Sequence, residues 1–162
     1  MEERAKEKVS ATRVFRNGSA VILTSICVIY VMFHIFTALH TYPALQQRSI
    51  HVMFALVLTF LIRPASPNLR DNKIALYIDI FLAGLAVVTG IYLFSQYETL
   101  TLRIGRITPM DFWLGVINLL LLLEAARRML GMLLPGLALV VFAYNFLGPY
   151  LPGALGHRGY PL

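Results

Sequence analysis

The chain has 162 residues, of which 58% are hydrophobic and 14% are charged, and its mean hydropathy is +0.71. Soluble domains carry about 25% charged residues, so this composition cannot cover a water-facing surface and indicates a membrane protein. The one cysteine, Cys27, excludes an intramolecular disulfide framework. The formal charge of +6 comes from Lys and Arg side chains that border apolar runs, a pattern typical of membrane spans and not of nucleic-acid binding.

The first predicted span follows a polar N-terminal segment. Residues 1–18 carry charges of both signs, which predicts a solvated cytoplasmic tail or a short surface helix. Residues 19–39 then contain no charged side chain, and a run of this length crosses a hydrocarbon core of about 30 Å. The run is longer than the apolar region of a signal peptide, and no cleavage pattern of small residues follows it. We therefore expect a retained first transmembrane helix.

The second predicted span returns after a short turn that contains a proline. It has an apolar core of residues 50–62, and residues 45–49 extend this core to a sufficient length. The extension requires that Gln46, Gln47 and Arg48 lie at the membrane interface or face protein.

The third predicted span covers residues 74–94, and Asp71 or Asn72 is a suitable N-cap for it. It holds one acid, Asp79, close to its start. The more ordinary interpretation of Asp79 is hydrogen bonding at the interface or between helices. The alternative is coupling to an ion, because an acid within a membrane span is a functional hypothesis by default.

The fourth predicted span opens at Thr108, with proline at the first helical position and Asp111 at the third, and runs through Leu123. A further apolar run, residues 129–147, follows almost without a loop. One straight helix over both runs would be about 50 Å long, which exceeds one crossing. Two alternatives therefore remain.

In the first alternative, the chain forms a tight helical hairpin around residues 124–128. In the second, one half of the segment lies along the membrane interface. Pro135 and Gly136 permit a kink in either case.

Continuous apolar runs of about twenty residues predict helices and not the strands of a membrane barrel, whose apolar positions alternate. We therefore expect one all-α membrane domain of four to five transmembrane helices, with Gly84 and Gly90 allowing close helix packing. With the N-terminus inside, ten Lys and Arg fall on inner segments and four on outer segments. This bias predicts a cytoplasmic N-terminus, with residues 148–162 outside.

A charged group, Glu124 with Arg127 and Arg128, interrupts the long apolar segment. The spacing of three and four residues places an ion pair on one helix face. One interpretation is a boundary, with side chains that reach water at the inner end of the fourth span. A second is a buried pair that docks this helix against a partner, and a third is a proton relay.

His34 and His51 flank the first predicted hairpin at similar depth. Two histidines on neighbouring helices could ligate a b-type haem, so a small membrane electron carrier is an alternative function. A pair of hydrogen-bonding histidines is the simpler interpretation. Arg48 lies three residues before His51 and is an unfavourable neighbour for an imidazole that must stay neutral. No P-loop, nucleophile elbow, zinc spacing or dinucleotide fingerprint occurs, so we expect neither an enzyme nor a cofactor in this chain.

Three stretches carry a resemblance to a known family: LQQRSIHVMFAL (45–56), TPMDFWLGVINLLLLLEAARR (108–128) and LPGLALVVFAYNFLGPYLPGALGHRGY (134–160). The chain resembles the N-terminal part of the fused membrane permease of TRAP transporters (tripartite ATP-independent periplasmic) of the type that works with a TAXI-class binding protein. The charged, Pro and Gly positions of the last two stretches fall in register over some forty residues.

The resemblance implies secondary transport in a bacterial or archaeal cytoplasmic (inner) membrane. A periplasmic solute-binding protein of that family hands an organic acid to a permease driven by a Na⁺ or H⁺ gradient. By resemblance, residues 19–128 are the small four-helix part and residues 129–162 begin the large part. The substrate and ion sites of the large part have no matching positions here. We accordingly expect a scaffold that needs the large permease part, whether the chain is a fragment, a split gene product or a subunit, and a non-functional remnant is a further alternative.

Overall fold

The computed structural model describes residues 12–13, 15, 18–103, 106–147 and 150, which are helical for most of their length, with no strand among them. The predicted N-terminal tail up to residue 11 and most of the segment after residue 147 lie outside this part. In chain order, the elements are α2 (Gly18–Leu39), α3 (Ala44–Ile62), the 3-10 helix η1 (Pro67–Leu69), α4 (Lys73–Ser95), α5 (Tyr97–Leu102), α6 (Pro109–Leu130) and α7 (Leu133–Leu147).

Four of these helices, α2, α3, α4 and α6, are long and apolar enough to cross a membrane. The fifth apolar helix, α7, has 15 residues and is therefore about 22 Å long, short of the hydrocarbon core. The prediction of an all-α, multi-pass membrane protein is confirmed. The ends of α2 and α4 differ from the predicted spans by no more than one residue.

The starts of α4 and α6 are fixed by side-chain caps. Asn72 caps α4, because its Oδ1 accepts hydrogen bonds from the backbone N–H groups of Ile74 and Ala75. Thr108 and Asp111 form a reciprocal capping box at the start of α6, with proline at the first position. Each cap satisfies backbone N–H groups that have no partner within the helix.

The break between α6 and α7 lies at Gly131, which has a φ of 82° and so adopts a conformation that favours glycine. The proposed hairpin around residues 124–128 is therefore misplaced, because these residues form the last turns of α6. Pro135 does not kink a helix either. It lies in the first turn of α7, where a missing backbone N–H removes no helical hydrogen bond.

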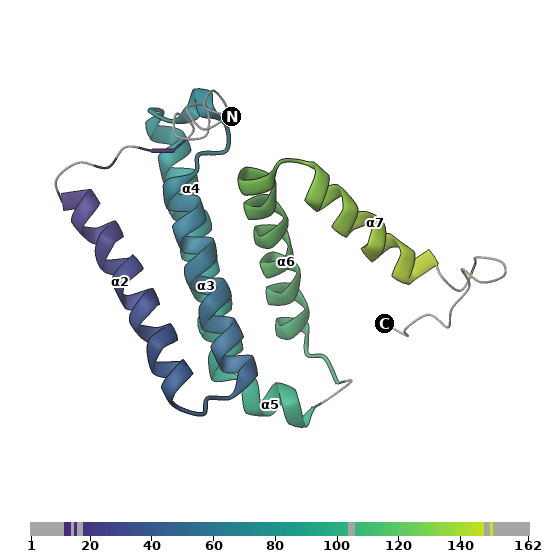
Figure 1. The fold of residues 1–162 in the computed structure, drawn as a ribbon. Helices are drawn as coiled ribbons and strands as arrows, with labels where there is room; N and C mark the ends of the chain where they lie inside the picture. Colours follow the sequence, from purple (N-terminus) through teal and green to yellow (C-terminus); the bar gives the residue numbers. More distant parts are fainter. Residues whose placement is uncertain (1–11, 14, 16–17, 104–105, 148–149, 151–162) are drawn as a thin grey trace.

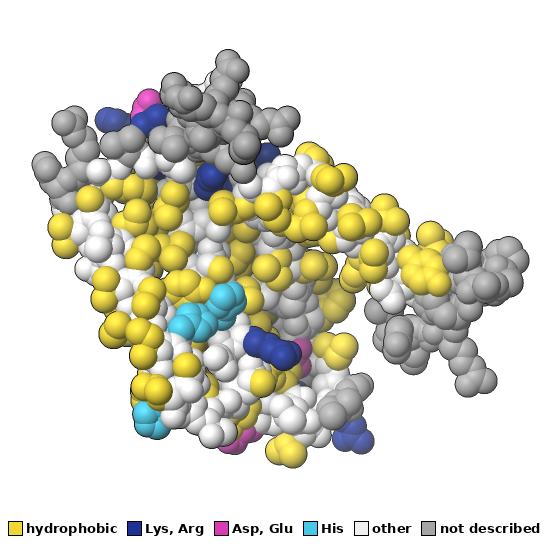
Figure 2. Space-filling model, in the orientation of Figure 1, with side chains coloured by type: hydrophobic (Ala, Val, Ile, Leu, Met, Phe, Trp, Pro, Cys, Tyr) yellow, Lys and Arg dark blue, Asp and Glu magenta, His cyan; other side chains and the backbone are white. Residues whose placement is uncertain are grey.

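The helices form a bundle in which α3 and α4 lie side by side, α6 packs against both, and α2 flanks α3 (Figure 1). From the end of α6, α7 slants away from the bundle (Figure 1). Hydrophobic side chains cover much of the surface in Figure 2, as expected for helices that face lipid. The small buried core consists of Leu56, Phe60, Ala83, Ala86, Leu121 and Ala125.

Close approach of α3 and α4 depends on Gly90. A Cβ at this position would lie 2.6 Å from Cβ of Met53, whereas a Cβ at Gly84 would meet nothing within 4 Å. Of the two glycines that the sequence suggests for close packing, only Gly90 is at a helix contact. Helix association in lipid relies on such van der Waals packing, because lipid tails are as apolar as leucine.

We predict that Gly90→Ala destabilises the bundle by about 1–3 kcal/mol. The added methyl group would clash with Cβ of Met53, which is attached directly to the α3 backbone, so α3 and α4 would have to move apart. The matched control, Gly84→Ala, should be neutral or stabilising, since alanine is the better helix former and the site is open. Thermal unfolding of both variants in the same detergent measures the difference. Equal melting temperatures would contradict the proposed packing role of Gly90.

Candidate functional site

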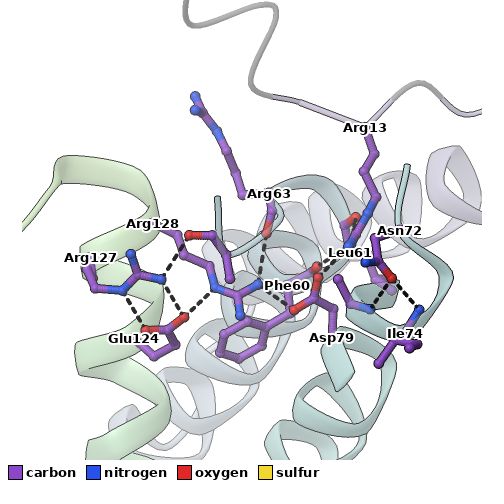
Figure 3. Close-up of polar contacts among 12 residues, drawn as sticks. Arg13, Phe60, Leu61, Arg63, Asn72, Ile74, Asp79, Glu124, Arg127 and Arg128 are labelled. Atoms are coloured by element: carbon purple, nitrogen blue, oxygen red, sulfur yellow. Dashed lines mark hydrogen bonds and ion pairs between the residues drawn. The ribbon is translucent and has the colours of Figure 1, made fainter. Parts of the chain in front are cut away.

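A buried carboxylate, Asp79 on α4, lies at the centre of a charge cluster that joins three parts of the chain (Figure 3). Its side chain is 1% exposed. One oxygen, Oδ2, accepts a hydrogen bond from Nη2 of Arg13 at 2.5 Å. The other, Oδ1, accepts one from Nη1 of Arg128 on α6 at 2.6 Å. Asp79 thus connects the N-terminal segment and α6 to α4.

Arg13 also caps the C-terminal end of α3. Its backbone N–H donates to the carbonyl of Ile62 at 2.9 Å, and Nη1 donates to the carbonyls of Phe60 and Leu61, each at 3.3 Å. These carbonyls belong to the last turn of α3, which has no helical donors for them and carries a partial negative charge. A guanidinium therefore fits this position well.

The placement of Arg13 differs from the sequence prediction for this one residue. Its surrounding sequence predicts a solvated tail or a short surface helix, yet the Arg13 side chain is only 6% exposed. Local composition gives no sign of this burial, because the groups that bind Arg13 lie 47 to 66 residues further along the chain. In the sequence, the one signal is Asp79 itself, because an acid within a membrane span requires a basic or hydrogen-bonding partner from another part of the chain.

Arg128 binds three different groups from a buried position. Besides Asp79, its Nη1 donates to the carbonyl of Arg63 at 2.9 Å, and its Nε donates to Oε1 of Glu124 at 2.7 Å. The guanidinium also lies over the ring of Phe60, 4.9 Å from the ring centre, in a cation–π contact. With 2% of its side chain exposed, Arg128 docks α6 onto α3 and α4.

The outer part of the cluster is partly open to solvent. Arg127 donates from Nε and Nη2 to the carboxylate of Glu124 at 2.8 and 2.9 Å, and Nη2 also donates to the carbonyl of Ala65. The side chains of Glu124 and Arg127 are 30% and 35% exposed. Glu124 thus bridges a buried guanidinium and a half-exposed one.

The structure separates the alternatives left open for the three residues of the E-A-A-R-R motif. Arg128 takes part in buried helix docking, whereas Glu124 and Arg127 lie at the boundary of the same cluster. All of these groups lie at one end of the bundle, where α4 begins and α6 ends (Figure 1). A cluster confined to one end does not form a path for protons across the bundle.

A second polar cluster ties the helices at the opposite end. The hydroxyl of Tyr92 on α4 donates to Oδ1 of Asp111 at 2.5 Å, and Arg103 lies 3.7 Å from the other carboxylate oxygen. The sequence identifies Asp111 only as a capping residue of α6. Its contact with Tyr92 depends on the packing of α4 against α6, which no local pattern reports.

Of Gln46, Gln47 and Arg48, which are predicted to lie at the membrane interface or to face protein, the two glutamines bond to neighbouring helices. Gln46 donates to the carbonyl of Phe94 at the end of α4, and Gln47 donates to the hydroxyl of Thr37 on α2. Arg48 is exposed and lines a groove of about 160 Å³ between α3, α4 and α6.

The two histidines lie together on the α2–α3 face, where Nε2 of His34 and Nδ1 of His51 are 3.1 Å apart. The hydroxyl of Tyr30 lies 2.8 Å from the same Nδ1. Two axial haem ligands must lie on opposite faces of the macrocycle, with the iron between their two nitrogen atoms. Rings in direct hydrogen-bonding contact do not fit that requirement, so the arrangement matches the simpler interpretation, a polar contact between two helices.

We predict that the purified protein has no Soret band that shifts on reduction, because His34 and His51 bond to each other. The measurement is an absorption spectrum of the detergent-solubilised protein before and after dithionite, following expression with added haem precursor. A reducible Soret band that disappears in His51→Ala would overturn this expectation and support the electron carrier.

No protein-family model, curated protein or solved structure matches this chain. The fold is that of an α-helical, multi-pass membrane protein, and the buried charge cluster around Asp79 joins its helices.

We predict that Asp79→Asn destabilises the protein by about 3–5 kcal/mol, because it removes the carboxylate that the buried Arg13 and Arg128 share and leaves Arg128 with only the partly exposed Glu124. The comparison variant Arg127→Gln removes a half-exposed partner and should cost about 0–1 kcal/mol. Thermal unfolding in detergent compares the two.

A third variant tests whether the cost comes from unpaired charge. Combining Asp79→Leu with Arg13→Met and Arg128→Met removes all three buried charges and should recover part of the stability lost in Asp79→Asn. An Asp79→Asn protein as stable as the parent would show that the cluster does not hold the helices together.

Proposed function

We propose that this chain is the scaffold part of a TRAP-type secondary transporter in a bacterial or archaeal cytoplasmic membrane. The transporter would import an organic acid that a periplasmic TAXI-type binding protein delivers, driven by a Na⁺ or H⁺ gradient. The observation that carries the proposal is the position of the E-A-A-R-R motif. Of the residues in this motif, Arg128 binds Asp79 on α4 and the carbonyl of Arg63 at the end of α3. Arg127 binds the carbonyl of Ala65 in the loop after α3, and Glu124 bonds to both arginines.

A scaffold role fits the distribution of polar contacts. A part that holds a moving transport domain must keep its own shape while the partner moves. The Asp79 cluster ties α3, α4 and α6 at one end, and the Tyr92–Asp111 contact ties α4 to α6 at the other. Contacts at both ends resist sliding and splaying of these helices, which is the mechanical requirement for a scaffold.

The proposal assigns α7 to the junction with the large permease part. Leu133 is 86% exposed and Val140 is 66% exposed, and Pro135 is the buried residue of this helix. A short apolar helix that leaves the bundle needs lipid or another protein on most of its sides. The large part of the permease supplies such a partner, while Na⁺ or H⁺ coupling and substrate binding belong to that part.

We predict that the tagged chain co-purifies with a large multi-pass permease subunit when both are expressed in one membrane. The experiment uses solubilisation in a mild detergent, affinity purification and identification of the partner by mass spectrometry. Asp79→Asn, which loosens the bundle, should lower the recovered partner at least severalfold, whereas Arg106→Gln in an exposed loop should not.

Two outcomes would oppose the proposal. A chain that accumulates in the membrane but purifies without the co-expressed subunit would point to an independent function. A chain that fails to accumulate in the membrane, with or without the subunit, would point to a non-functional remnant.

A further inference from the structure

A pocket of about 260 Å³ opens beside the Asp79 cluster, between the N-terminal segment and the start of α4. Its walls come from Arg13 and Ser19 on one side and from Arg70 and Lys73 on the other, with Leu76 one turn further along α4. Of the eight lining residues, three are cationic and one, Asp71, is acidic. The pocket therefore combines concave shape with positive charge.

The cations of the pocket differ in how they are held. Arg13 forms part of the wall and is fixed by Asp79, and its Nε is buried with no hydrogen-bond partner in the described part of the chain. Arg70 is half-buried, and Lys73 is exposed on the first turn of α4. The one acid of the lining, Asp71, is exposed. Arg13 is paired with Asp79, so the cations that can meet a phosphate group in the pocket are the guanidinium of Arg70 and the ammonium of Lys73.

The surrounding end of the bundle is also positive. Among the described residues at this end, six basic side chains face three acids, Asp71, Asp79 and Glu124, which leaves an excess of three positive charges. Figure 2 shows several Lys and Arg side chains at this end of the molecule and others toward the opposite end. The Lys and Arg bias predicts that this end lies at the cytoplasmic surface, where anionic lipids create a negative potential.

Apolar surface continues directly from the pocket toward the membrane. Ile74 and Tyr77, on the first turns of α4, are each 70% exposed, and Leu76 lines the pocket itself. A free phosphate ion would use only the cationic groups. A phospholipid would use both, with its phosphate among the cations and its acyl chains along α4.

We propose that this pocket binds the phosphate of an anionic phospholipid headgroup in the cytoplasmic leaflet. The bound lipid holds the N-terminal segment against α4 and so supports the contact of Arg13 with Asp79. This binding is independent of the transport role proposed above, because it requires only the described end of the bundle.

The test compares lipid binding by the intact protein and two single-charge variants. Native mass spectrometry follows titration with phosphatidylglycerol, phosphatidylcholine or inorganic phosphate. We expect phosphatidylglycerol to bind in preference to phosphatidylcholine, and Lys73→Gln to weaken the phosphatidylglycerol complex about fivefold. The matched control Arg106→Gln removes an exposed cation near the opposite end and should leave this affinity unchanged.

Each other outcome decides against the proposal. Equal binding of the two lipids, or equal weakening by Lys73→Gln and Arg106→Gln, would show general attraction to charge and no built site. Inorganic phosphate that binds at the same concentration as phosphatidylglycerol, and competes with it, would identify a free-anion site. Because Lys73 is exposed, Lys73→Gln should fold, and its unfolding temperature in neutral detergent checks this point.

Discussion

The packing of this bundle depends on one carboxylate that two guanidinium groups share. Asp79 is almost fully buried, and its two oxygens take their donors from different directions, Arg13 on one side and Arg128 on the other. Neither a lone acid nor a lone arginine is tolerated at low cost away from water. The three groups must therefore come together in the same fold. This requirement fixes the position of α6 and of Arg13 relative to α4.

The charged residue Asp79 and the small residues that pack against α3 lie on the same face of α4. Asp79, Ala83, Ala86 and Gly90 follow one another at spacings of four, three and four residues, and all four are buried. The small side chains allow α3 to approach α4 closely, and this approach brings the carbonyls at the end of α3 within reach of the arginines. The polar cluster forms because the helices are close, and it also holds them there. Weakening either contribution should therefore affect the other.

The sequence predicts the helices well and the contacts between them poorly. Uninterrupted apolar runs locate the four long helices, because a membrane demands about twenty such residues in a row. Caps at Asn72 and Thr108 follow from local chemistry and appear where expected. The partners of Asp79 do not follow, since Arg13 lies in a segment whose charges all look solvent-exposed. The break at Gly131 was missed because the more conspicuous charged and proline residues flank it on both sides.

The polar contacts leave α2 and α7 less firmly attached than α3, α4 and α6. Thr37 is the buried residue of α2, and this helix reaches α3 mainly through half-exposed side chains, including Tyr30 and His34. Pro135 is the buried residue of α7. Helices with so little buried surface can adjust to lipid or to another protein without disturbing the Asp79 cluster. The fold thus combines a firmly held centre, formed by α3, α4 and α6, with two loosely attached helices, and both features suit the scaffold role that we propose.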